Sequence, residues 1–68
     1  MFVTARDELL IFFAKEGFTV VDFAEKVGIS RPTAYGVLKK KAIKTTTAKV
    51  ICDTFGWDMM DYFELVLD

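Results

Sequence analysis

Signals that start and stop helices recur at short intervals along this chain, and they constrain its fold more than any other feature. Thr19, Ser30 and Asp58 belong to the residue types preferred at helix N-caps. Gly28 and Gly56 belong to the type that most often follows the last residue of a helix. The spacing leaves about two to three helical turns between a start signal and the next stop signal. The sequence therefore predicts a series of short helices.

The first two helices share one start signal, a hydroxyl residue followed three positions later by an acid. Thr4 with Asp7 predicts a first helix that Gly17 ends, and Thr19 begins the second helix in the same way. This first helix is apolar around much of its circumference, which predicts that it is largely buried. The second helix has one apolar face at i, i+3, i+4 and i+7, made by Val20, Phe23, Ala24 and Val27.

Three more helices follow. The third begins at Ser30, with Pro32 in the first turn, where the missing backbone N–H costs nothing. The fourth begins near residues 45–47 and ends at Gly56, and the fifth begins at Asp58. The apolar residues of the fifth recur at helical spacing as far as Val66: Met59, Tyr62, Phe63 and Val66. Because no segment alternates long enough to indicate a strand, we expect one all-α domain over residues 1–68, a compact bundle of about five short helices.

The composition excludes several classes of protein. A hydrophobic content of 53% argues against intrinsic disorder. The sequence has no His and a single Cys, so a His-dependent active site, an internal disulfide and a Cys/His zinc site are all excluded. We expect no enzyme activity, no catalytic residue, no metal and no cofactor. A lone thiol, Cys52, fits a reducing compartment, and we expect a cytoplasmic protein in which Cys52 is a small buried hydrophobe.

Charged residues are segregated along the chain, although they nearly cancel in the total of −1. Residues 30–52 carry six basic side chains and no acidic one, whereas residues 53–68 carry five acidic side chains and no basic one. A charged partner responds to the local patch, because salt screens charges beyond about 10 Å. The basic segment therefore favours an anionic partner. Alternatively, Lys39, Lys40 and Lys41 only solvate the end of a helix and favour its dipole.

The span from Val20 to Lys40, VVDFAEKVGISRPTAYGVLKK, meets the steric requirements of two helices packed steeply around a tight turn. Ala24 is small where the helices would touch, Gly28 permits a left-handed turn, and Ile29 would fill the gap between the helices. The inward residues of the second helix are then Ala34, Val37 and Leu38. This pattern resembles the Cro/C1-type helix-turn-helix family, the small phage repressors and Cro-like DNA-binding proteins.

The resemblance extends past the two helices. TAKVICDTFGWDMMDYF resembles the family's next helix, the glycine that ends it and the entry into the last helix, so the match covers nearly the whole chain. The resemblance implies a lambda repressor-like DNA-binding fold whose second motif helix, about residues 31–40, enters the major groove with its N-terminus first. It also implies that Thr19 contacts phosphate.

Geometry then assigns the outward residues of that helix to the DNA side. The candidates for base contact are Ser30, Arg31, Thr33, Tyr35 and Lys39, and Gly36 would let the backbones approach closely. Arg31 is the strongest of these, because its guanidinium matches guanine O6 and N7. The further phosphate candidates are Lys40, Lys44, Thr45, Thr46 and Thr47, the last four helped by a helix N-terminus.

Other roles remain open for these residues. Arg31 could instead pair with Glu25 or Asp22, Ser30 and Thr19 could act only as helix caps, and Tyr35 could pack over the surface. Pro32 departs from the family, which often has Gln or Ser in this part of the helix, so specificity would rest on fewer base contacts.

The apolar content exceeds what so short a chain can bury, which predicts a homodimer. We assign its interface to the C-terminal apolar residues Trp57, Met60, Phe63, Leu65 and Leu67. A two-fold dimer would match a pseudo-palindromic operator in double-stranded DNA. The leading hypothesis is a transcriptional regulator of the phage or prophage type that acts by steric exclusion. The alternative is a protein-binding module, an anti-repressor or modulator that pairs with another regulator and has weak DNA affinity.

Overall fold

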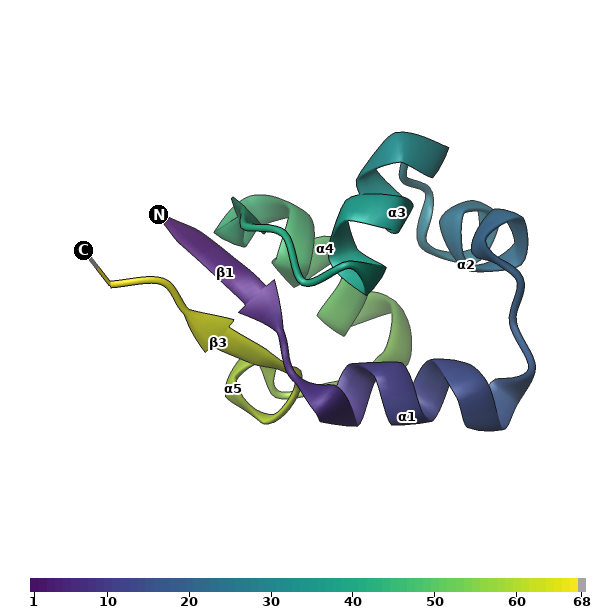
Figure 1. Cartoon of the computed structure of the whole chain (residues 1–68), viewed down its shortest axis with the longest axis horizontal. Helices are drawn as coiled ribbons and strands as arrows, with labels where there is room; N and C mark the ends of the chain where they lie inside the picture. The colour runs from purple at the N-terminus through teal and green to yellow at the C-terminus, as the bar shows by residue number, and fades with distance from the viewer. Residues whose placement is uncertain (68) are drawn as a thin grey trace.

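The computed structural model describes residues 1–67, which form five helices and three short strands (Figure 1). The number of helices matches the prediction. The helices are α1 Asp7–Glu16, α2 Val20–Val27, α3 Arg31–Leu38, α4 Thr45–Phe55 and α5 Met59–Tyr62. The strands are β1 Phe2–Ala5, β2 Ile43–Lys44 and β3 Phe63–Leu65.

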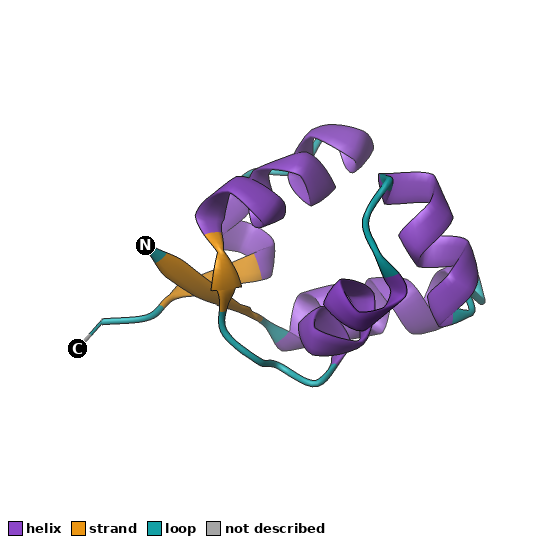
Figure 2. Ribbon diagram, turned by 90° about the horizontal axis from the view of Figure 1, so that it is seen from above, coloured by secondary structure: helices purple, strands orange, loops and turns teal. Residues whose placement is uncertain are grey.

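The strands form a small antiparallel sheet in the order β2-β1-β3. The domain is therefore mostly helical, as predicted, but it is not purely all-α. In β1, Val3 lies opposite Ile43 of β2 on one side and Leu65 of β3 on the other. Val3 is fully buried and Phe2 is about half exposed, the alternation typical of a sheet with one face on the core. Figure 2 shows the strands gathered at one end of the molecule, with the N-terminus and the last described residues beside them.

The start of α1 is a second correction, because Thr4 lies in β1 opposite Glu64 and caps no helix. The N-cap is Arg6, which makes no side-chain cap hydrogen bond. Its backbone N–H instead donates to the carbonyl of Tyr62 at 2.8 Å, and its Nε lies 3.0 Å from the carbonyl oxygens of both Met60 and Phe63. Contacts with the far end of the chain therefore set this helix start.

The fifth helix is also shorter than predicted. It ends at Tyr62, and Phe63 is extended, with φ −132° and ψ 151°. Apolar residues at helical spacing beyond Tyr62 predicted a helix as far as Val66, but this segment pairs with β1 instead. The backbone N–H of Val66 donates to the carbonyl of Phe2 at 2.9 Å. The strand satisfies backbone groups of both chain segments and buries Phe63 completely.

The remaining helix signals are confirmed. Thr19 and Asp22 form a reciprocal capping box with distances of 3.1 and 3.2 Å, and Asp58 accepts from the N–H of Met60 at 3.0 Å. Helices α1, α2 and α4 end at the predicted glycines. Capping of this kind depends only on residues two to four positions apart, which is why the sequence was sufficient to locate it.

The core contains residues from β1, from helices α1 to α4 and from β3. Its largest fully buried side chains are Phe23, Phe63, Leu9, Ile51, Val3 and Val37. Cys52 is 3% exposed and unpaired, as expected for a small hydrophobe, and burial raises the pKa of its thiol. Within residues 1–67 no helix is long and apolar enough to cross a membrane, and no group of three or more His, Cys, Asp or Glu side chains is placed to hold a metal ion.

Candidate nucleic-acid interface

Helices α2 and α3 pack against each other around a tight turn at Gly28. Gly28 has φ 82°, a left-handed conformation that an L side chain rarely adopts. The N–H groups of Gly28 and Ile29 donate to the carbonyl of Ala24, at 2.8 and 3.0 Å. Ala24 is 3% exposed, and the side chain of Ile29 packs against the core. The sequence prediction for each of these three positions is confirmed.

Helix α3 has one buried face and one exposed face. Ala34 and Val37 are fully buried, and Leu38 packs against the core. In Figure 1, the N-terminal end of α3 lies at the top of the molecule and α1 lies at the bottom. The predicted reading residues lie on the outer part of α3: Ser30, Arg31, Tyr35 and Lys39 are exposed, and Thr33 is partly buried.

Arg31 is free of acidic partners at the start of α3. The described residues contain two ion pairs, Lys40 with Asp7 and Lys49 with Asp53, so the alternative pairing of Arg31 with Glu25 or Asp22 does not form there. A guanidinium that is exposed and unpaired is available to an external acceptor.

Ser30 is the N-cap of α3, which is one of the two roles that the sequence analysis offered for it, the other being base contact. Its Oγ accepts from the backbone N–H of Thr33 at 3.3 Å, and the two hydroxyl oxygens lie 2.8 Å apart. Both hydroxyls are therefore already engaged with each other. The guanidinium of Arg31, by contrast, forms no ion pair among the described residues that an approaching base would have to displace.

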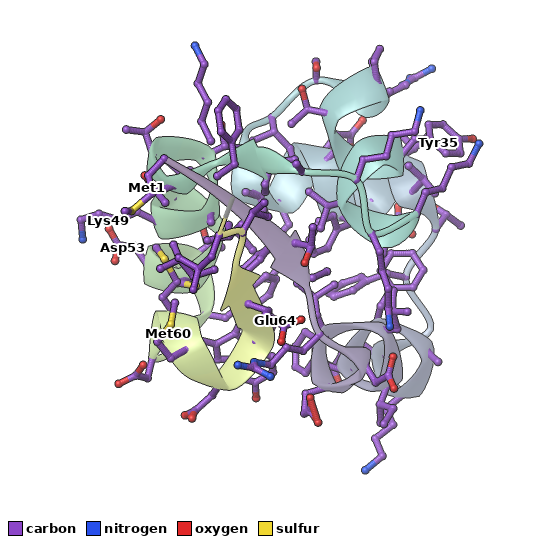
Figure 3. The ribbon with its side chains drawn as sticks, turned by 60° about the vertical axis from the view of Figure 1, so that its left-hand side comes forward. Met1, Tyr35, Lys49, Asp53, Met60 and Glu64 are labelled. Atoms are coloured by element: carbon purple, nitrogen blue, oxygen red, sulfur yellow. The ribbon has the colours of Figure 1, made fainter. Side chains whose placement is uncertain are left out.

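Tyr35 extends from the outer face of α3, away from the body of the molecule (Figure 3). Its side chain is 51% exposed, and the Nζ of Lys39 lies 6.0 Å from the centre of its ring. This distance is at the limit of a cation–π contact, so the two side chains form a loose pair. About half of the Tyr35 side chain is therefore open to an external partner.

Gly36 lies inside α3, where glycine is unfavourable for a helix. A Cβ built at this position would approach nothing closer than the Cβ of Lys41, at 4.0 Å, and the backbone conformation is an ordinary helical one. The fold therefore does not require glycine here. The space that a side chain would occupy at this position is open.

Lys40 points away from the other predicted phosphate contacts. Its Nζ forms an ion pair and hydrogen bond with the carboxylate of Asp7, at the start of α1. This hydrogen bond and the nearby positive charge hold the pKa of Asp7 below its ordinary value of 3.8. Lys40 also has φ 59°, and the N–H of Lys41 beyond it donates to the carbonyl of Gly36 at 2.9 Å, which ends α3.

The remaining phosphate candidates surround the start of α4. Lys44 and Thr46 are exposed, whereas Thr45 and Thr47 are partly buried. The N–H of Thr45 donates to the carbonyl of Met1 at 3.1 Å, so β1 holds this helix start in place. Thr19 is separate from this group, and its Oγ1 accepts from the N–H of Asp22.

A family model for Cro/C1-type HTH DNA-binding domains matches residues 8–68 of the chain. The chain belongs to this family. A search of curated proteins and of solved structures returned no significant match. The family assignment confirms the predicted resemblance, and the matched residues include α2 and α3.

Two features relevant to a Cro/C1-type domain were missed by the sequence analysis. The first is the ion pair between Asp7 and Lys40, which are 33 residues apart, so no local pattern could indicate it. The second is Ile11, a large apolar side chain on α1 that is 52% exposed. The sequence analysis predicted that the first helix is largely buried and did not single out Ile11 as an exposed position.

The residues predicted to form the dimer interface differ in burial, so they do not all belong to one exposed surface. Phe63 is fully buried in the core of the protomer, so its assignment to an interface is wrong, and Trp57 is stacked between the rings of Phe55 and Tyr62 at centroid distances of 4.6 and 3.7 Å. Leu65 is partly buried. Met60 and Leu67 are 47% and 77% exposed and remain candidates.

Proposed function

We propose that the chain is a sequence-specific transcriptional regulator that inserts α3 into the major groove of operator DNA. The observation that carries this proposal is the outer face of α3, where Arg31, Tyr35 and Lys39 are exposed and no acidic side chain occurs between residues 30 and 52. The Cro/C1-type family match supports the same partner.

Each residue of this face has a proposed role. Arg31 donates two hydrogen bonds to guanine O6 and N7, and Tyr35 and Thr33 contact bases or a thymine methyl group. Ser30 and Lys39 complete the base-contacting set. Gly36, which the fold does not require, gives the sugar-phosphate backbone room to approach α3.

Phosphate contacts would hold the domain on the duplex without reading its sequence. We assign them to Lys44 and to the start of α4, at Thr45, Thr46 and Thr47, together with Thr19 at the start of α2. Lys40 would join them only by leaving Asp7. Such contacts make binding depend strongly on salt, because each releases counterions from the DNA.

We further propose that the regulator binds as a homodimer, cytoplasmic and of the phage or prophage type, and represses by steric exclusion. The exposed apolar side chains Met60 and Leu67 support a partner surface near the C-terminal strand, to which Leu65 and the edge of Trp57 would contribute. A two-fold axis would then place two α3 helices about 34 Å apart, one turn of DNA, on a pseudo-palindromic operator.

The test is a titration against DNA from immediately upstream of its own gene and against random DNA, each at several salt concentrations. We expect a preference for the upstream DNA and a steep loss of affinity with salt. Arg31→Ala should weaken binding to the preferred site by about 1–3 kcal/mol and leave random DNA almost unchanged. Lys26→Ala, which removes an exposed cation to which no DNA contact is assigned, is the matched control and should change neither.

The protein-binding alternative is favoured by one observation, the number of large apolar side chains left exposed, including Ile11, Met60 and Leu67. A folded protein that fails to bind either DNA at about 50 mM salt would support this alternative and contradict operator binding.

A further inference from the structure

Helix α1 presents a stripe of four side chains that takes no part in the proposed DNA contacts. Glu8, Ile11, Phe12 and Lys15 follow one another at i, i+3, i+4 and i+7, the spacing of one helix face. Together with Tyr62 of α5 they line a shallow hollow of about 250 Å³. The centre of this stripe is apolar and its two ends are charged.

The floor of the hollow is aromatic and well packed. The ring of Phe12 meets Trp57 edge-on at a centroid distance of 4.7 Å, and Trp57 stacks on Tyr62 at 3.7 Å with an interplanar angle of 10°. Ile11 stands beside this floor with half of its surface in water. Packed aromatic rings beside an exposed aliphatic side chain form a preorganised apolar surface, which can be covered at little entropic cost.

The charges at the two ends have no ion-pair partner among the described residues of the protomer. Neither Glu8 nor Lys15 takes part in an ion pair among residues 1–67, and both are exposed. The order along the helix is acid, apolar, apolar, base. If a second α1 helix lies antiparallel to the first, with a two-fold axis between positions 11 and 12, position 8 faces position 15 and position 11 faces position 12.

We propose that the face formed by Glu8, Ile11, Phe12 and Lys15 pairs with the same face of a second copy of this chain. A two-fold contact requires a surface that is complementary to itself. This stripe meets that requirement, because antiparallel pairing places acid against base at the ends and apolar side chains against each other at the centre. Each of the two outer contacts joins Glu8 of one copy to Lys15 of the other, and the inner contacts join Ile11 to Phe12. A partner of unrelated sequence would have to reproduce this order of charges.

The contact is small. Four side chains on one helix cover far less than the roughly 800 Å² per partner of a stable complex. Pairing is therefore weak in free solution and becomes effective when two copies are already held close together. It differs from the proposed operator dimer, which uses residues near the C-terminal strand.

The position of α1 gives this pairing a consequence for DNA, which rests on the proposed function. In Figure 1, α1 lies at the bottom of the molecule and the N-terminal end of α3 lies at the top. Pairing through α1 therefore leaves the N-terminal end of α3, which the proposed function inserts into DNA, free in each copy to bind its own DNA segment. Such an arrangement joins proteins bound to separate DNA segments, and so favours bridging or looping.

Charge reversal tests the contact in the full chain without DNA. Glu8→Lys and Lys15→Glu each place like charges in both outer contacts, and each should weaken self-association about tenfold in sedimentation equilibrium at high protein concentration. An equimolar mixture of the two variants restores opposite charges in both contacts. The mixture should therefore associate as the parent chain does, as should the double variant E8K/K15E.

The recovery in the mixture separates pairing from any effect on folding, because each variant alone associates about tenfold more weakly and both are present unchanged in the mixture. Circular dichroism confirms that each is folded. Equal association of the parent and both single variants, or a mixture no stronger than its components, would overturn the proposal. In a DNA pull-down between two operator fragments, the single variants should bind each fragment normally and fail to join them. Loss of binding to a single fragment would count instead against the proposed function.

Discussion

At the scale of single residues, the role proposed for Gly36 predicts opposite effects of one substitution on stability and on DNA binding. Alanine fits at this position, because a Cβ would meet only the Cβ of Lys41 at 4.0 Å. Gly36→Ala should raise the free energy of unfolding by about 1 kcal/mol, since alanine is the better helix former. The same methyl group would obstruct the approach of the DNA backbone, so affinity for the operator should fall. Denaturant unfolding and a DNA titration measure the two effects, and a variant with higher stability and unchanged affinity would contradict the proposed role of Gly36.

Asp7 and Lys40 form the second residue-scale case, and it concerns pH. Because Lys40 lowers the pKa of Asp7 in the folded state, the pair stabilises the fold above the ordinary pKa of 3.8. That contribution is lost as the pH falls from 3.8 towards the lower pKa of the folded state. Asp7→Asn should therefore destabilise the protein near neutral pH and have a smaller effect in acid. Both groups are exposed, so high salt should reduce the difference as well.

Thermal unfolding of the parent chain and of Asp7→Asn, at pH 7 and near pH 3, measures this difference. Asp22→Asn is a poor control because it alters the capping box of α2, whereas Asp61→Asn changes an exposed carboxylate that forms no ion pair within the described residues. A deficit for Asp7→Asn that is equally large at both pH values would contradict the assignment.

At the scale of elements, the two threonines that the sequence predicts to be helix caps have different structural roles, because Thr19 caps α2 whereas Thr4 lies in β1. Thr19→Ala removes the hydroxyl that accepts from the N–H of Asp22, so α2 should lose about 1 kcal/mol, or roughly 4–8 °C in Tm. Thr19→Ser keeps the hydroxyl and should lose little. Thr4→Ala, at a position that the sequence predicts to be a cap, should not show the loss typical of a cap, because Thr4 lies in β1. A cap-sized loss at Thr4 together with none at Thr19 would reverse the two assignments.

The same contrast explains how much of the fold was predictable. The starts of α2 and α3 and the glycine turns were predicted because each depends on residues three or four positions apart. The strands were missed because β1 pairs with residues about 40 and 60 positions further along the chain, and four residues with one alternation carry too weak a local signal. The apolar residues of β3 match a helix equally well, and only the available edge of β1 decides between the two structures.

The same distinction between local and long-range contacts applies to the candidate site. The outer face of α3 was predictable, since the inward positions of a short helix determine the outward ones. The pairing of Lys40 with Asp7 was not, because it depends on how the end of α3 lies relative to α1. The burial of Phe63 was missed for the same reason: a residue assigned to the end of a helix proved to be a strand residue opposite Ala5.

At the scale of the whole molecule, the sheet joins the first segment of the chain to the last and so limits which residues can test the dimer. Phe63 is fully buried, and its truncation to alanine should cost about 3–5 kcal/mol. A chain of this length has a total stability of roughly 3–10 kcal/mol, so Phe63→Ala is expected to unfold rather than to become a monomer. The exposed residues beyond β3 are the useful probes.

Leu67→Glu therefore tests the operator dimer. Leu67 is 77% exposed, so the substitution should leave the circular dichroism spectrum unchanged while it places a charge in the proposed interface. Sedimentation at dilute protein concentration should show a shift from dimer to monomer, and operator affinity should fall with it because one protomer makes too few contacts. Ala14→Glu adds the same charge at an exposed position of α1 and should leave the dimer intact. A parent dimer whose mass is unchanged by Leu67→Glu would exclude Leu67 from the interface, and equal dissociation by both variants would point to net charge rather than to a defined surface.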